Sequence, residues 1–374
     1  MNPQAFLAQI AKHPTPDQWR VLADLLAGRG DIRGPLLNAQ LGDSLTLEQI
    51  RAHRAELLGP FGVEAAVPER PSGTQKGLAA LVARASEPAN EQTPSTEPGF
   101  APCLLHEDWF GGFLIEATLA RANGTSPPLE ELLDVLLDQP AGVALRRLAF
   151  GSPSRHTDAP VDWSHVMRVL VKRGPHPWLK ELRIGHPRDP LDRAGPTGSL
   201  QGLAQALPNL ERLHIRDAVV SDFDFDVLAQ LVSLEARVDP GTVWLEALKH
   251  PMSNLEQLVL DLPDFKGPFS TLRVVPLRFT SLRSLTLQRY ARPRFLGEIV
   301  EHPILPQLDV LSVANCEIDE EGVAPLFADP DAFGHLKAFD LSGNQLSEDV
   351  VDNLGALFPD ADLSDQDYYE EIME

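Results

Sequence analysis

Five basic residues occupy related positions in the first part of a repeated pattern, and they are the side chains with the clearest chemistry. They lie in or beside the segments LRRLAF, LKELRI and LERLHI, and they are Arg147, Arg183, Arg212, His214 and Arg216. If each segment is a strand, alternate residues face the same side, so these groups would share one exposed surface. Guanidinium groups bind carboxylates through charge-assisted hydrogen bonds. The predicted chemistry is therefore attraction of an acidic protein surface.

The same residues also have a structural interpretation. Glu181, Glu211 and Asp217 lie close to them in the sequence, and ladders of opposite charge across neighbouring strands stabilise sheets. The sequence leaves both interpretations open. Aromatic residues are scarce at these positions, which disfavours single-stranded nucleic acid. The net charge of −22 and the pI near 4.8 also argue against nucleic acid or an anionic membrane as the partner.

Catalytic and metal-binding signatures are weak. The sequence lacks a phosphate-binding G-x-x-x-x-G-K-[ST] loop, a G-x-G-x-x-G turn and an H-E-x-x-H zinc motif. It also lacks a G-x-S-x-G nucleophile elbow, since GSPSR at 151–155 ends in arginine. His176, His186 and His214 could meet in space, but no carboxylate or cysteine spacing supports a metal site. We therefore expect no enzyme activity, no metal and no cofactor.

Three aspartates and two cysteines have simpler explanations than a site. Asp222, Asp224 and Asp226 are spaced two apart, but the glycine and glutamate of a calcium-binding loop are missing. Capping of a helix N-terminus is the expected role. The two cysteines, Cys103 and Cys316, are too few for a disulfide framework or a four-ligand zinc site.

Residues 308–346 indicate the elements that carry these side chains. LDVLSVANCEI and LKAFDLSGNQL begin 28 residues apart and align as L-x-x-L/F-x-V/L-x-x-C/N-x-I/L. Cys316 and Asn344 occupy the turn position of the two copies. The pattern and its period resemble those of leucine-rich repeats. In such repeats the apolar residues of a short strand enter one core, and the repeats must stack to bury it.

Earlier copies extend this resemblance towards the N-terminus. The predicted copies start at 145, 179, 210, 234, 255, 282, 308 and 336, with the copy at 234 weak because Arg237 and Asp239 take apolar positions. Helical segments follow the strands. The predicted fold class is therefore α/β, a leucine-rich-repeat solenoid with a curved parallel sheet, helices on its convex side and a small N-terminal helical domain.

The first 63 residues predict helices near 2–12, 17–28, 30–41 and 47–58. Phe6-Leu7, the run from Trp19 to Asp24, Leu26 and the GDIRG run at 30–34 resemble the bacterial repeat-companion domain, although Leu25 and Pro35 depart from that family's usual pattern. The resemblance implies a bacterial protein with a following repeat array. Asp31 and Arg33 favour helix capping, with a docking loop as the alternative.

Composition predicts the remaining boundaries. Residues 64–102 are rich in Pro, Ser, Thr and Glu, which is typical of a linker. Residues 103–144 are expected to cap the array, 145–358 to form the repeats and 359–374 to form an acidic cap or tail.

These observations predict a non-catalytic protein–protein interaction module that binds an unidentified protein on the concave face. Two alternatives remain. One is an enzyme or enzyme subunit with its site in the N-terminal domain or the array loops. The other is an acidic neutralising partner of a cationic protein. The sequence has no secretory signal pattern and no apolar run of membrane-spanning length, so cytoplasmic localisation is expected.

Overall fold

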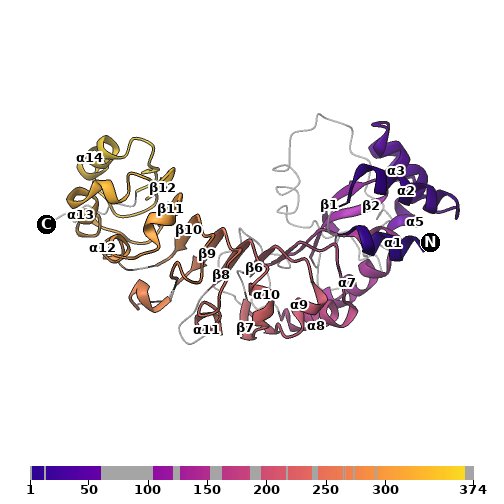
Figure 1. Ribbon diagram of the computed structural model, residues 1–374, viewed down its shortest axis with the longest axis horizontal. Helices are drawn as coiled ribbons and strands as arrows, with labels where there is room; N and C mark the ends of the chain where they lie inside the picture. Colours follow the sequence, from indigo (N-terminus) through magenta and orange to yellow (C-terminus); the bar gives the residue numbers. More distant parts are fainter. Residues whose placement is uncertain are drawn as a thin grey trace, which may run out of the picture.

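The fold is a curved array of strands with helices on its outer side (Figure 1). The computed structural model describes residues 2–11, 14–59, 104–120, 127–151, 162–185, 195–215, 218–237 and 243–366, the last range with gaps at 264, 266, 273, 291 and 293. Within these ranges one large sheet has the order β1-β2-β3-β4-β6-β8-β9-β10-β11-β12. Apart from the antiparallel β1–β2 hairpin, its neighbouring strands are parallel.

The strands are short because each repeat contributes only a few residues to the sheet. Those of the main sheet are β1 (Leu104–Phe110), β2 (Phe113–Leu119), β3 (Arg147–Phe150), β4 (Glu181–Ile184), β6 (Arg212–Ile215), β8 (Ser233–Arg237), β9 (Gln257–Asp261), β10 (Ser284–Gln288), β11 (Val310–Ser312) and β12 (Ala338–Asp340). A separate two-stranded sheet pairs β5 (Gly195–Ser199) with β7 (Ala218–Asp222).

The predicted leucine pattern forms continuous buried rows across the sheet. Leu148, Leu182 and Leu213 are in register and almost completely buried. One predicted copy was wrong. Leu234 pairs with Leu213, so it takes the second apolar position and that copy begins at Leu231 rather than 234. The third position is Ala236, which is buried but small. A search for large apolar residues therefore misplaces this copy by three residues.

Helices and 3₁₀ turns cover the outer side of the sheet (Figure 1). They are α7 (Leu129–Asp138), η3 (Pro140–Ala144), α8 (Ser164–Arg173), α9 (Leu203–Ala206), α10 (Phe225–Leu228), α11 (Val243–Ala247), η4 (Phe269–Leu272), α12 (Phe295–Val300), η5 (Leu305–Gln307), α13 (Glu320–Ala328), η6 (Pro330–Ala332) and α14 (Glu348–Leu357). The Asp224 side chain accepts a 3.2 Å hydrogen bond from Asp226 N at the start of α10, which confirms its predicted capping role. Beyond α14, Asp362 bridges to Asp340 and extends the ladder.

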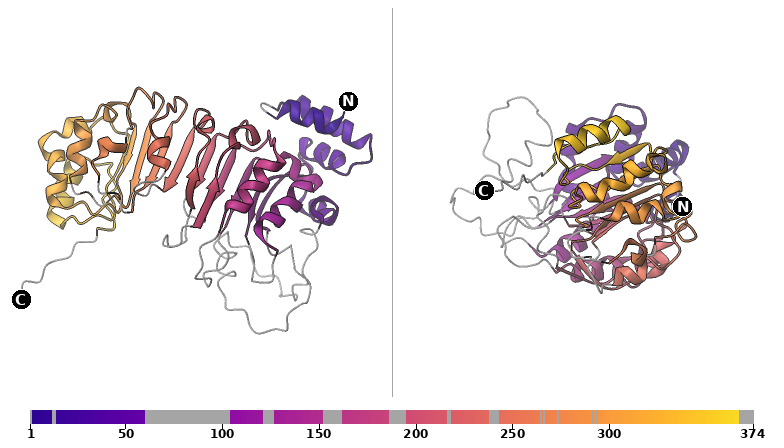
Figure 2. Two further views of the ribbon diagram at one scale, coloured as in Figure 1. Left: turned by 90° about the horizontal axis from the view of Figure 1, so that it is seen from below. Right: turned by 90° about the vertical axis from the view of Figure 1, so that its left-hand side faces the viewer.

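The N-terminal helices lie at one end of the array and α13 and α14 at the other (Figure 2). The N-terminal helices are α1 (Pro3–Ile10), α2 (Pro16–Ala27), α3 (Arg33–Leu41), α4 (Leu47–Ala52) and α5 (Arg54–Leu58). The predicted helix over 47–58 is interrupted at His53. Thr15 and Thr46 each form a capping box, with Gln18 and Gln49 respectively, which fixes where α2 and α4 begin.

The N-terminal helices pack directly on the β1–β2 hairpin. At the hairpin turn Gly111 has a φ of 53°, and a Cβ there would lie 2.6 Å from Leu37 Cα. Only glycine permits so close an approach in this conformation. Trp19 shares a buried cluster with Phe113 and with Trp178, whose indole N–H donates to Leu7 O at 3.1 Å. The helices and the first repeats therefore share buried apolar surface.

The Asp31–Arg33 turn contacts the array from within the molecule. Arg33 N and Nε each donate to the Asp31 carboxylate, and Nη1 donates to Pro140 O at 2.6 Å, one residue beyond the C-cap of α7. These contacts hold the turn within the molecule, but Ile32 is the N-cap of α3 and α3 has no side-chain cap hydrogen bond, so Asp31 does not cap this helix as predicted. The predicted linker and residues 367–374 of the predicted acidic tail lie outside the described residues, so the predicted domain boundaries stay predictions.

Candidate functional site on the concave face

The parallel register aligns the exposed strand residues in two rows. The first row contains Glu116, Arg147, Glu181, Arg212, Ser233, Gln257, Ser284, Val310 and Ala338. The second row contains Thr118, Ala149, Arg183, His214, Glu235, Val259, Thr286, Ser312 and Asp340. Arg147, Arg183, Arg212 and His214 thus share one face, which we name the arginine face. Arg216 lies outside the described residues.

A buried carboxylate organises the centre of the arginine face. The Glu181 side chain is only 5% exposed, and its oxygens lie 2.5 Å from Arg183 Nε and 3.8 Å from Arg212 Nη1. His214 Nε2 lies 3.8 Å from Glu181, while its Nδ1 lies 2.9 Å from Glu235. Further along, Arg147 contacts Glu116 at 2.7 Å. The ion pairs therefore form two groups, one between the β1–β2 hairpin and β3 and the other from β4 to β8.

The two signs of charge differ in their exposure. The arginine side chains are about half exposed, with values of 46% for Arg147 and 50% for both Arg183 and Arg212. Their glutamate partners lie deeper, at 28% for Glu116 and 5% for Glu181, whereas Asp108, a second partner of Arg147, is 59% exposed. Because the glutamates lie beneath the guanidinium groups, they hold the guanidinium groups in place. The outer edges of the guanidinium groups face solvent. Such an arrangement can accept the carboxylates of a second molecule.

The ion pairs support the structural interpretation of the basic residues, while binding of a partner stays a prediction. These pairs include Glu181 as expected, but Glu211 pairs instead with Lys180 at 2.5 Å, and Asp217 lies outside the described residues. Sequence reasoning missed Glu235 because the copy containing it was misaligned. It missed Glu116 because the β1–β2 hairpin lacks the leucine pattern that marks the exposed positions.

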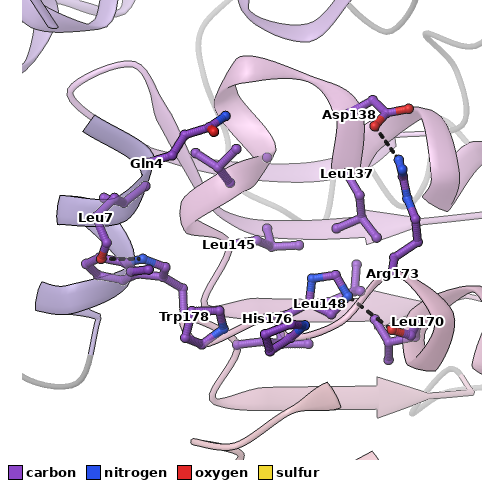
Figure 3. A pocket seen from close by; sticks show the side chains of 16 residues that line it. Gln4, Leu7, Leu137, Asp138, Leu145, Leu148, Leu170, Arg173, His176 and Trp178 are labelled. Atoms are coloured by element: carbon purple, nitrogen blue, oxygen red, sulfur yellow. Dashed lines mark hydrogen bonds and ion pairs between the residues drawn. The ribbon is translucent and has the colours of Figure 1, made fainter. Parts of the chain in front are cut away.

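A crevice lies beneath helix α1, and both apolar and polar side chains line it (Figure 3). Its volume is about 280 Å³, and Leu7, Leu145 and Trp178 line it. The His176 ring at its edge is hydrogen-bonded to Leu170 O at 3.1 Å. Burial lowers the pKa of His176, and the Leu170 carbonyl opposes this shift only in part. The crevice thus carries an imidazole whose charged form is disfavoured by burial, and the ion pair of Arg173 with Asp138.

The described residues contain no group of three or more His, Cys, Asp or Glu side chains arranged to hold a metal ion. Of the three histidines considered from the sequence, His186 lies outside the described residues. Cys316 is buried, and burial raises the pKa of its thiol to about 12. Its Sγ donates to Leu287 O at 3.4 Å. The predicted structural role of this cysteine at the repeat turn agrees with its position.

Solved structures provide the first comparison. A protein of Bacteroides fragilis matches with a TM-score of 0.54 and 22% identity, over 64% of this chain and 71% of that one. A leucine-rich-repeat protein of Leptospira interrogans has a TM-score of 0.33 and 13% identity, over 62% and 56% of the two chains. An internalin of Listeria monocytogenes has a TM-score of 0.30 and 15% identity, over 68% and 82%.

No family model matches the chain, and no curated protein matches it. The resemblance to a repeat-companion domain therefore stays a prediction. The parallel ladder, the buried leucine rows and the outer helices define a leucine-rich-repeat fold. As for membranes, none of the helices within the described ranges has the length and apolar character needed to cross one.

Proposed function

We propose that this protein is a non-catalytic interaction module that binds an acidic surface of another protein through its arginine face. The observation that carries the proposal is the buried Glu181 beneath two half-exposed arginines. Ordering long side chains on binding has an entropic cost. Here the buried carboxylate already restrains Arg183 and Arg212, so less of that cost remains. Leucine-rich-repeat arrays also offer an extended concave surface to a partner.

The charge distribution adds selectivity. The whole chain carries a net charge of −22, so an acidic partner is repelled by most of the surface and attracted where guanidinium groups are exposed. Charge complementarity of this kind directs encounter and excludes wrong orientations. A partner would therefore meet the array at β3, β4 and β6, where the exposed arginines lie.

The test compares three baits in pull-downs from a lysate of the source cell. The first is the wild-type chain, the second carries Arg147→Ala, Arg183→Ala and Arg212→Ala, and the third is a control. Arg283→Ala is the matched control, because Arg283 precedes β10, away from the arginine face. A partner captured by wild type and by the control, but lost with the triple variant, supports the proposal if all baits unfold at similar denaturant concentrations.

Retention of the same partner by the triple variant would contradict the proposal. A salt titration adds a second criterion. Capture through half-exposed charges should weaken as ionic strength rises, because the Debye length falls to about 3 Å at 1 M salt. Capture that is insensitive to salt would place the contact elsewhere on the molecule.

A further inference from the structure

A second surface lies where the β1–β2 hairpin, the start of α2 and the residues preceding β3 and β4 meet. It is a groove of about 550 Å³. The residues that line it include Trp109, Phe110, Ile115, Arg146, Lys180 and Asp108. We name it the Arg146 groove. It is separate from the crevice beneath α1.

Arg146 is the unusual residue of this groove. Its Nε is buried and has no hydrogen-bond acceptor, and no carboxylate in the described part of the chain forms an ion pair with it. Its guanidinium carbon lies 5.7 Å from the centre of the Trp178 ring, a cation–π contact. Lys180 differs, because its Nζ is paired with Glu211 at 2.5 Å. Arg146 also lines the groove, so its guanidinium group is suited to receive an anionic group from outside.

The walls of the groove are apolar and aromatic. Trp109, Phe110 and Ile115 are each half-buried and pack against the two apolar clusters. Phe110 is supported from behind by Trp19, whose ring centre lies 5.0 Å away. Aromatic side chains bury large apolar areas with few torsions to restrain. The groove therefore offers an apolar contact surface beside a guanidinium group.

The charges around the groove favour an anion on balance. The other two charged lining residues have partners, Lys180 in Glu211 and Asp108 in Arg147, which leaves the charge of Arg146 as the one that favours an anion. Asp108 is directed towards the arginine face, where it lies 3.9 Å from Arg147. This contact also shows that the groove and the arginine face adjoin. A segment bound along one would reach the other.

We propose that the Arg146 groove binds a protein segment in which an aspartate or glutamate stands beside an aromatic or aliphatic residue. The carboxylate contacts Arg146, and the apolar side chain lies against Trp109 and Ile115. This inference rests on the proposed function, since it supplies the apolar anchor that the arginine face lacks. Interfaces obtain most of their binding energy from a few such aromatic and arginine contacts.

The experiment selects peptides from a displayed library of random twelve-residue sequences on the full wild-type chain. Selected sequences are then synthesised with acetylated and amidated ends, so that a terminal carboxylate cannot be the ligand. Binding is followed by tryptophan fluorescence and calorimetry. We expect enrichment of an acidic residue next to an aromatic or aliphatic one. Arg146→Gln should weaken binding about tenfold or more, the usual loss for a charge-assisted contact.

Arg283→Gln is the matched control, because the backbone ladder places Arg283 at the same repeat position as Arg146. It should change peptide affinity less than about twofold. Trp109→Ala is a second test, which remains informative if Arg146→Gln does not fold, and it should weaken the same peptides. Replacement of the peptide's acidic residue by the corresponding amide should weaken binding as much as Arg146→Gln does.

Three results would overturn the inference: no enriched sequence, enrichment without an acidic residue, or peptides that bind Arg146→Gln as tightly as wild type. These results are distinguishable from a failure of the proposed function. The pull-down depends on Arg147, Arg183 and Arg212, whereas the peptide test depends on Arg146, which the triple variant leaves intact.

Discussion

The two ends of the sheet are stabilised by different interactions. Between β11 and β12 the main polar residue is Asn344, which is completely buried. Its Oδ1 accepts from Cys316 N and Ile318 N at 3.0 and 3.1 Å, and its Nδ2 donates to Val313 O and Leu341 O at 3.0 and 2.7 Å. Around β4 and β6, by contrast, the central polar residue is the buried carboxylate of Glu181 beneath two arginines.

The polar residues of the two ends therefore have different roles: those of the last repeats stabilise the fold, and those of the early repeats are available for recognition. Neutral hydrogen bonds at the turns of the last repeats satisfy backbone groups. The concave strands of these repeats carry small side chains, such as Ser312 and Thr286. Charged residues on the early strands add little to the apolar core, but they give that part of the concave face its chemistry. One scaffold thus carries a structural end and a chemically distinctive end.

The largest expected effect is at the structural end. Asn344→Ala leaves two buried N–H groups and two buried carbonyls without their partner, so we expect the free energy of unfolding to fall by about 3 kcal/mol or more. The loss should be insensitive to salt. Chemical denaturation at low and high salt measures it, with the exposed Asn353→Ala as a control that should cost about 0.5 kcal/mol or less. Equal losses for both variants would contradict the role of Asn344.

A smaller effect is expected at the charged end. Glu181→Gln removes the carboxylate that holds Arg183 and Arg212, so the free energy of unfolding should fall by about 1–2 kcal/mol. Because the arginines are half exposed, the loss should shrink as salt rises. Glu211→Gln, which breaks a more exposed pair with Lys180, is the control and should cost about 0–1 kcal/mol. If the loss of unfolding free energy in Glu181→Gln did not depend on salt, the two ends of the sheet would not differ in the way we describe.

A third prediction concerns the concave face at β11 and β12, away from the arginines. Ser312 Oγ donates to the Asp340 carboxylate at 2.8 Å, so Ser312→Ala should reduce the free energy of unfolding by about 0.5–1 kcal/mol. Thr286→Val, in the same row on the neighbouring strand, serves as the control and should have a smaller effect. Neither change should alter partner capture. Loss of the partner with Ser312→Ala would show that recognition extends beyond the arginine face.

The smallest expected effect is a pH dependence at His176. Because burial lowers its pKa below the ordinary value of 6.5, the unfolded chain binds this proton at a higher pH than the folded chain does. The contribution of His176 is therefore fully present above pH 6.5 and is lost as the pH falls towards the folded pKa. Unfolding of wild type and His176→Gln across this range should show converging stabilities at acidic pH. A nuclear magnetic resonance titration that gave a raised pKa would contradict this.

Much of the scaffold could be predicted because its determinants are local. Alternation of apolar residues fixes which side of a strand is buried, and this correctly placed Leu148, Leu182 and Leu213 in one row. The same alternation put Arg147, Arg183 and Arg212 on one exposed face before any geometry was known. It failed at Leu234, where the small Ala236 concealed the third position of the repeat. There the register of the sheet, rather than the size of each side chain, identifies the alignment.

By itself, then, the sequence determined the repeat, the buried rows and the face on which the early arginines lie. Only the tertiary structure decided which charges meet, because Arg147 with Glu116 and Glu181 with Arg212 come from segments far apart in the chain. The Arg146 groove is also a product of docking, since α2, the hairpin and two later strand starts each contribute to it. Periodicity is a property of neighbours along the chain, whereas these contacts depend on how whole segments pack against one another.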